Sequence, residues 1–116
     1  ALTDPDWWCR NPMEKQIAKA YTRNIFYKFQ KEMRESLSYD CEHLNGYQFE
    51  LAIIDAPVPH YGYRNYRVFA NWHDGTFSCN CCKFERDGML CCHVIKVMSQ
   101  LKIHQIPDRY ILKRWG

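Results

Sequence analysis

Long apolar runs are missing from this sequence. None approaches the about 20 consecutive residues that a membrane-spanning helix needs, and no signal-peptide pattern opens the chain. The chain also has no internal repeats, no low-complexity segment, no glycine-rich phosphate loop and no nucleophile elbow. We therefore expect no membrane partner, no small-molecule substrate and no enzymatic activity.

Strong charge of either sign is missing as well. The formal net charge is only +3, whereas a nucleic-acid-binding domain commonly has a pI above about 9 and a clear basic stripe. What the chain does contain is apolar, since 47% of its 116 residues are hydrophobic, enough for one compact core. Because it begins at Ala1 rather than at a methionine, we expect it to be a piece of a longer protein.

The cysteines are crowded near the C-terminus. Five of the seven lie between Cys79 and Cys92, and His93 follows at once, whereas Cys9 and Cys41 are isolated. A secreted disulfide framework would spread an even number of cysteines along the chain. The odd count and the adjacent histidine indicate an intracellular metal site instead.

The N-terminal part has helical signals. Residues 1–11 show no period and are interpreted as a lead-in arm. Asn11 is a suitable helix cap and Pro12 suits the first helical position, so residues 12–36 form one kinked helix or two short ones. Apolar residues recur there at helical spacing and predict a buried face: Ile25, Phe26, Phe29 and Met33.

The pattern then changes to that of a sheet. Residues 37–78 alternate in polarity and predict three antiparallel strands, with a hairpin turn at Asn45-Gly46. A turn at Asp74-Gly75 folds the end of the third strand over. Residues 79–104 contain the cysteine cluster and a short amphipathic helix, and the tail 105–116 is broken by Pro107. The expected class is α+β.

The tail and the arm carry large apolar and aromatic residues whose role the sequence leaves open. They either fold back onto the core or form a docking patch for another protein, and the residues concerned are Trp7, Trp8, Tyr110, Leu112 and Trp115.

Six side chains compete for the four places of a tetrahedral zinc site. The first pair is Cys79 with either Cys81 or Cys82, and spacing alone favours the commoner Cys-x-x-Cys knuckle. The second pair comes from Cys91, Cys92 and His93. Cys91 and His93 can face one point if Cys91 immediately precedes the helix, but the spacing does not decide the set.

A family resemblance bears on this choice. Residues 79–93, "CNCCKFERDGMLCCH", resemble the SWIM zinc finger, whose pattern is Cys-x-Cys, a variable spacer and Cys-x-His. The match is closest to the far-red impaired response family of plant transcription regulators, which derive from Mutator-like transposases. The flanking segments "NPMEKQ", "YTRNIFYKFQ" and "IPDRYILKRW" also resemble that family.

The resemblance implies that Cys79, Cys81, Cys91 and His93 hold Zn²⁺ in a structural site, with Cys82 and Cys92 as free thiols beside it. It implies a nuclear location and a module that supports self-association, partner binding and transcriptional activity. In the transposase relatives the catalytic acidic residues belong to an upstream domain, so this region is expected to be inert. The equivalent region of an active transposase is the alternative.

Direct DNA contact is a second hypothesis. From Lys83 to Arg114 there are seven basic and three acidic residues. The candidate phosphate-binding side chains are Lys83, Arg86, Lys96 and Lys102. In the family, however, sequence-specific DNA reading is attributed to a separate N-terminal zinc domain, so any contact here is accessory.

Overall fold

Two helices, not one kinked helix, open the part of the chain that the computed structural model describes, residues 11–54 and 65–111. Helix α1 spans Pro12–Ala20 and α2 spans Arg23–Ser36. The Asn11 side chain caps α1 by accepting a hydrogen bond from the Met13 N–H at 2.8 Å. Tyr21 is extended (φ −122°, ψ 162°) and separates the two helices.

Four strands follow, where the sequence predicts three. Strands β1 (Tyr39–His43), β2 (Gln48–Ile53), β3 (Tyr66–Asn71) and β4 (Thr76–Cys79) form one antiparallel sheet in that order. The expected Asn45-Gly46 turn joins β1 to β2, with Gly46 at φ 52°. The prediction of three strands is wrong because the four residues of β4 are too few to show an alternation of their own.

The missed strand begins at the predicted Asp74-Gly75 turn. The Asn71 side chain accepts hydrogen bonds from the His73 and Asp74 N–H groups, and the Asp74 side chain accepts one from Thr76 N–H. Gly75 has a φ of 74°, which a glycine adopts without strain. The chain therefore reverses fully, and residues Thr76 to Cys79 pair with β3 rather than extending it.

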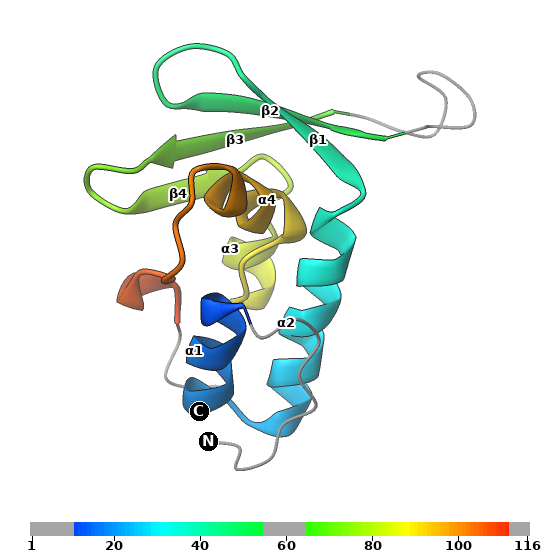
Figure 1. Ribbon diagram of the computed structural model, residues 1–116, viewed down its shortest axis with the longest axis vertical. Helices are drawn as coiled ribbons and strands as arrows, with labels where there is room; N and C mark the ends of the chain where they lie inside the picture. Colours follow the sequence, from blue (N-terminus) through cyan, green and yellow to red (C-terminus); the bar gives the residue numbers. More distant parts are fainter. Residues whose placement is uncertain (1–10, 55–64, 112–116) are drawn as a thin grey trace.

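Three shorter elements complete the fold. Helix α3 spans Lys83–Asp87, α4 spans Cys92–Gln100, and a 3₁₀ turn, η1, spans Asp108–Tyr110. Figure 1 shows α4 beneath the sheet, with α1 and α2 beyond it. None of the helices in the described residues is long and apolar enough to cross a membrane.

One core lies between the sheet and the helices. The inward-facing residues of the strands alternate with outward-facing ones, so Phe49, Leu51, Val68 and Ala70 are buried with Phe77 and Cys79. The predicted apolar face of α2 is buried as expected: Ile25, Phe26, Phe29 and Met33. Helix α4 adds buried residues from both of its sides, namely Val94, Ile95, Val97 and Met98.

The segment after α4 returns to the first helix. Gln16 and Ile106 exchange two hydrogen bonds, from Gln16 Nε2 to the Ile106 carbonyl at 2.8 Å and from Ile106 N–H to Gln16 Oε1 at 2.7 Å. The Tyr110 hydroxyl accepts a hydrogen bond from Phe77 N–H at 2.7 Å. Tyr110 therefore folds back onto the core. Trp7, Trp8, Leu112 and Trp115 lie outside the described residues.

Candidate metal centre

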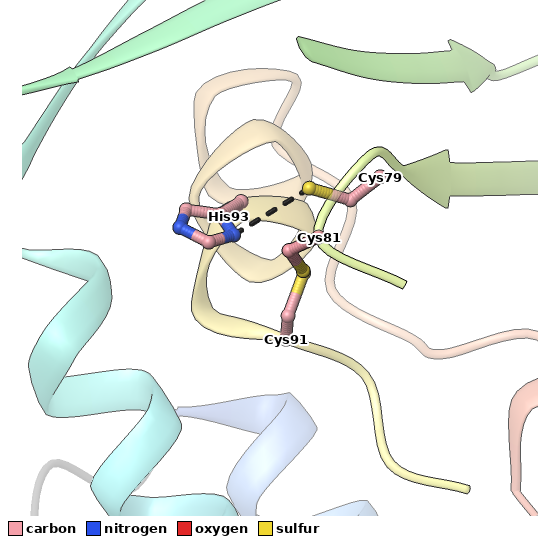
Figure 2. Close-up of side chains that lie close together, drawn as sticks. All are labelled: Cys79, Cys81, Cys91 and His93. Carbon is pink, nitrogen blue, oxygen red and sulfur yellow. Dashed lines mark hydrogen bonds between the residues drawn. The ribbon is translucent and has the colours of Figure 1, made fainter. Parts of the chain in front are cut away.

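Three cysteines and one histidine meet where the sheet passes into the last helix. Cys79 ends β4, Cys81 lies in the turn that follows, Cys91 caps α4, and His93 stands in the first turn of α4. Their ligand atoms all lie within 4.8 Å of one another. Figure 2 shows the four side chains pointing toward a common centre from these separate elements.

The backbone reverses twice to bring the two halves of this cluster together. Cys82 adopts the left-handed region (φ 60°), and the Cys82 N–H donates to the Cys79 carbonyl at 3.0 Å. Gly88, at the far end of α3, also adopts the left-handed region (φ 77°). A left-handed non-glycine residue is uncommon, and here it fixes the tight turn that contains Cys81.

The imidazole of His93 is held by aromatic rings. It stacks on Tyr66 at a centroid distance of 3.8 Å and meets Tyr39 edge-on at 4.8 Å. Nδ1 lies 3.5 Å from Cys79 Sγ and is the nitrogen that faces the cluster. Nε2 is buried and has no hydrogen-bond partner within the described part of the chain. Ring packing therefore fixes the orientation that a second-shell acceptor fixes in many metal sites.

Two of the three thiols, those of Cys81 and Cys91, have a raised pKa in the absence of a cation. Hydrogen bonding with Cys91, together with burial, raises the pKa of Cys81 to about 12. Hydrogen bonding with Cys79 raises the pKa of Cys91 to about 12. A divalent ion reverses this preference because the thiolate is the form that binds metal.

The donor set fits zinc. Three thiolates and one neutral imidazole are a common structural set, and four protein ligands leave no position for an activated water. With Zn²⁺ the group carries a net charge of −1, which favours nearby donors. One donor is in place, because the Val94 N–H points to Cys91 Sγ at 3.5 Å. We expect the bound ion to supply a cross-link between β4 and α4.

The two remaining cysteines of the crowded segment are placed apart from this group. Cys82 is exposed and its thiol lies 3.7 Å from the Asn80 carbonyl. Cys92 is buried and lies near Glu32 and Glu35 of α2, apart from the four clustered ligands. The structure thus brings Cys81, rather than Cys82, to Cys79.

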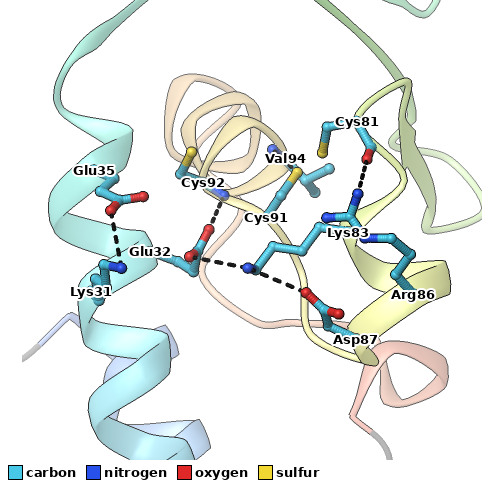
Figure 3. Close-up of polar contacts among 10 residues, drawn as sticks. All are labelled: Lys31, Glu32, Glu35, Cys81, Lys83, Arg86, Asp87, Cys91, Cys92 and Val94. Carbon is cyan, nitrogen blue, oxygen red and sulfur yellow. Dashed lines mark hydrogen bonds and ion pairs between the residues drawn. The ribbon is translucent and has the colours of Figure 1, made fainter.

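Glu32 of α2 is a residue that the sequence analysis missed. One carboxylate oxygen accepts a hydrogen bond from the Cys92 N–H at 2.9 Å, and the other lies 3.7 Å from Lys83 Nζ (Figure 3). Lys83 also pairs with Asp87 at 3.5 Å. Glu32 thereby joins α2 to both helices beside the cluster. In the sequence, the only sign of this role is that Glu32 lies among the apolar positions of α2.

The four basic candidates do not share one surface. Lys83 and Arg86 lie on α3 and line one groove with residues of α2, whereas neither Lys96 nor Lys102 lines it. Partial burial lowers the pKa of Lys83, but the Glu32 and Asp87 carboxylates more than offset this and raise it overall. Arg86 Nη1 donates to the Cys81 carbonyl at 3.4 Å.

The fold and the Cys₃His cluster define a zinc finger of the SWIM class, and residues 73–102 match the SWIM zinc finger family model. No solved structure is significantly similar to this chain. About 90% of the chain is homologous to a region of the FAR1-related sequence proteins of Arabidopsis thaliana.

Three of these relatives illustrate the extent of the homology. FAR1-RELATED SEQUENCE 12 is 34% identical over 91% of this chain, FAR1-RELATED SEQUENCE 7 is 38% identical over 91%, and FAR1-RELATED SEQUENCE 9 is 34% identical over 90%. The chain spans only 13%, 14% and 19% of their respective lengths. The similarity therefore concerns one region of much longer proteins.

Proposed function

We propose that this domain binds one structural zinc ion through Cys79, Cys81, Cys91 and His93. The convergence of four ligand atoms within 4.8 Å, from the end of a strand and the start of a helix, carries the proposal. Helix α3 itself is weakly packed, since none of its residues is buried and only Phe84 rests against the core. The ion's part is to hold the turn, α3 and the start of α4 in one arrangement.

Metal content by mass spectrometry of the native protein tests this assignment. We expect about one zinc per chain in the wild type and in Cys82→Ser, and loss of zinc in Cys81→Ser, because a structural site needs all four ligands. The Cys82→Ser variant is a matched control, since the two cysteines are adjacent and undergo the same substitution. Zinc lost from Cys82→Ser and kept by Cys81→Ser would contradict the ligand set.

We further propose that the zinc-bound domain is a protein-interaction or self-association module of a nuclear, transposase-derived transcription regulator. The homology to the FAR1-related proteins and the absence of an open metal position in the proposed ligand set support a binding role over a catalytic one. In a plant-cell reporter assay with the whole protein, Cys81→Ser should lose activity and Cys82→Ser should keep it. Equal activity of the two variants would contradict the proposal.

Accessory DNA contact is a second candidate, because two of the four basic candidates, Lys83 and Arg86, lie together on the short helix α3. Phosphate contacts release counterions, so binding to a random duplex would weaken steeply as salt rises. A shallow salt dependence, or no measurable binding, would leave protein interaction as the function.

A further inference from the structure

A groove of about 540 Å³ runs between α2 and α3, beside the Cys₃His cluster. This volume is within the range of sites that bind small ligands or a few side chains of a peptide. Its apolar floor consists of Ile25 and Met89, which are 7% and 8% exposed. Its walls carry charged side chains from both helices: Lys28, Lys31 and Glu32 of α2, and Lys83, Arg86 and Asp87 of α3.

The groove carries a positive charge that its own carboxylates neutralise only in part. Lys83 Nζ forms ion pairs with both carboxylates of the walls, at 3.7 Å from Glu32 and 3.5 Å from Asp87 (Figure 3). Lys31 pairs with Glu35 at 3.7 Å, but both side chains are well exposed, so this pair is weak and readily exchanged. Among the described residues, no ion pair is recorded for Lys28 or Arg86.

An apolar floor between cationic walls selects for a particular chemistry. We propose that the groove binds a short acidic peptide segment of a partner protein, with apolar side chains among its carboxylates. The apolar side chains would bury against Ile25 and Met89, and the carboxylates would pair with Lys28, Lys31 and Arg86. This inference rests on the proposed interaction function and specifies its partner.

The same observations disfavour the DNA backbone as the occupant. A phosphate backbone gains no binding energy from an apolar floor. It would also be repelled by the carboxylates of Glu32 and Asp87 that line the walls. The cationic side chains also surround a confined groove rather than following an extended surface, as backbone tracking requires.

The groove depends on the metal-bound arrangement of one of its walls. Helix α3 has only five residues, too few for an isolated helix to be stable in water. It is held between the turn that ends at Cys82 and the segment that leads to Cys91. Loss of zinc should therefore remove the α3 wall, and with it the binding of the peptide.

Fluorescence anisotropy with the zinc-loaded full chain tests the proposal. The probe is a fluorescein-labelled short peptide that alternates glutamate and leucine, and the comparison peptides replace leucine by serine or glutamate by lysine. We expect binding of the first peptide only, and its loss on zinc removal. The variant with Lys28→Glu and Lys31→Glu should bind about tenfold more weakly, because two attractions become repulsions.

A matched variant separates groove binding from an effect of net charge. Lys15→Glu combined with Arg34→Glu makes the same change in net charge at exposed helix positions that do not line the groove. It should bind within about twofold of the wild type if the groove is the site. The milder pair Lys28→Gln and Lys31→Gln should lose affinity to an intermediate degree, with thermal melting confirming that each variant folds.

Several outcomes would contradict the proposal that the groove binds an acidic peptide. These are equal weakening in the matched variant, equal binding of the serine peptide, or a labelled DNA duplex that binds more tightly than the peptide and depends equally on Lys28 and Lys31. If the peptide does not bind but transcription still requires Cys81, the peptide-binding proposal is rejected and the proposed function stands. If the zinc-loaded wild type binds the peptide as expected but Cys81→Ser leaves transcription unchanged, the proposed function is rejected instead.

Discussion

Burial separates Cys82 from Cys92, the two cysteines of the crowded segment that are not assigned to the metal. Cys82 is exposed, while Cys92 is only 5% exposed and lies in the first turn of α4. Burial, reinforced by the nearby Glu32 carboxylate, raises the pKa of Cys92 to about 12. Since the thiolate is the reactive form, Cys92 remains protonated and inert at neutral and mildly alkaline pH.

This difference predicts selective alkylation in the zinc-loaded protein. Iodoacetamide at pH 8 should modify Cys82 and leave Cys92 almost untouched, because pH 8 is far below the raised pKa of Cys92. Peptide mapping by mass spectrometry would measure both sites. The chelated, denatured chain is the control, in which both cysteines should react. Equal rates in the folded protein would contradict the placement of Cys92.

At the scale of elements, Glu32 connects α2 to the two helices beside the metal. It is 7% exposed, and it satisfies a backbone N–H in the first turn of α4 while pairing with Lys83. A carboxylate near a helix N-terminus is also favoured by the helix dipole. The contact spans 60 residues of sequence and ties the start of α4 to α2.

Removal of this carboxylate should destabilise the fold and loosen the metal site. We expect Glu32→Ala to lower the free energy of unfolding by about 2 kcal/mol, because the Cys92 N–H is left buried without an acceptor. Glu32→Gln keeps an acceptor and should cost about 1 kcal/mol or less.

Urea titration of the zinc-loaded protein would measure these changes, and competition with a chelator would measure zinc affinity. The control is Glu35→Gln, one turn further along α2, where the side chain is 48% exposed and a change of about 0.5 kcal/mol or less is expected. A Glu32→Ala variant as stable as the wild type would show that this contact does not hold α4.

Elements with a local signal could be predicted, and those that depend on distant partners could not. Asn11 and Pro12 mark the start of α1, and Asn45-Gly46 marks the first hairpin. Strand β4 and helix α3 were missed because four and five residues show no reliable period. Spacing also left Cys81 and Cys82 as alternatives, because the left-handed turn at Cys82 follows from the surrounding fold.

At the scale of the whole molecule, α4 is the layer that joins the sheet to the N-terminal helices. It packs against α2 on one side and against β1, β3 and β4 on the other, as Figure 1 shows. The proposed metal ligands Cys91 and His93 stand at its start, and Cys79 ends the edge strand β4. We therefore expect the stability of the central layer to be coupled to zinc binding.

Zinc removal should accordingly unfold the C-terminal half while part of the N-terminal helix pair persists. Structural zinc contributes ~10 kcal/mol or more in small finger peptides, which exceeds what the short β4 and α3 elements gain from packing. The helices α1 and α2 keep their own contacts, among them the buried hydrogen bond from Gln30 Nε2 to the Glu14 carboxylate at 2.7 Å.

Hydrogen exchange read out by mass spectrometry would follow this loss peptide by peptide. After chelation, protection around Val94 to Leu101 and in β4 should disappear, while peptides from α2 keep partial protection because local stability differs between regions. Adding zinc back should restore the original pattern, which controls for irreversible damage by the chelator. An exchange pattern unchanged after complete zinc removal would mean that packing alone holds α4, and that the cluster adds nothing to the fold.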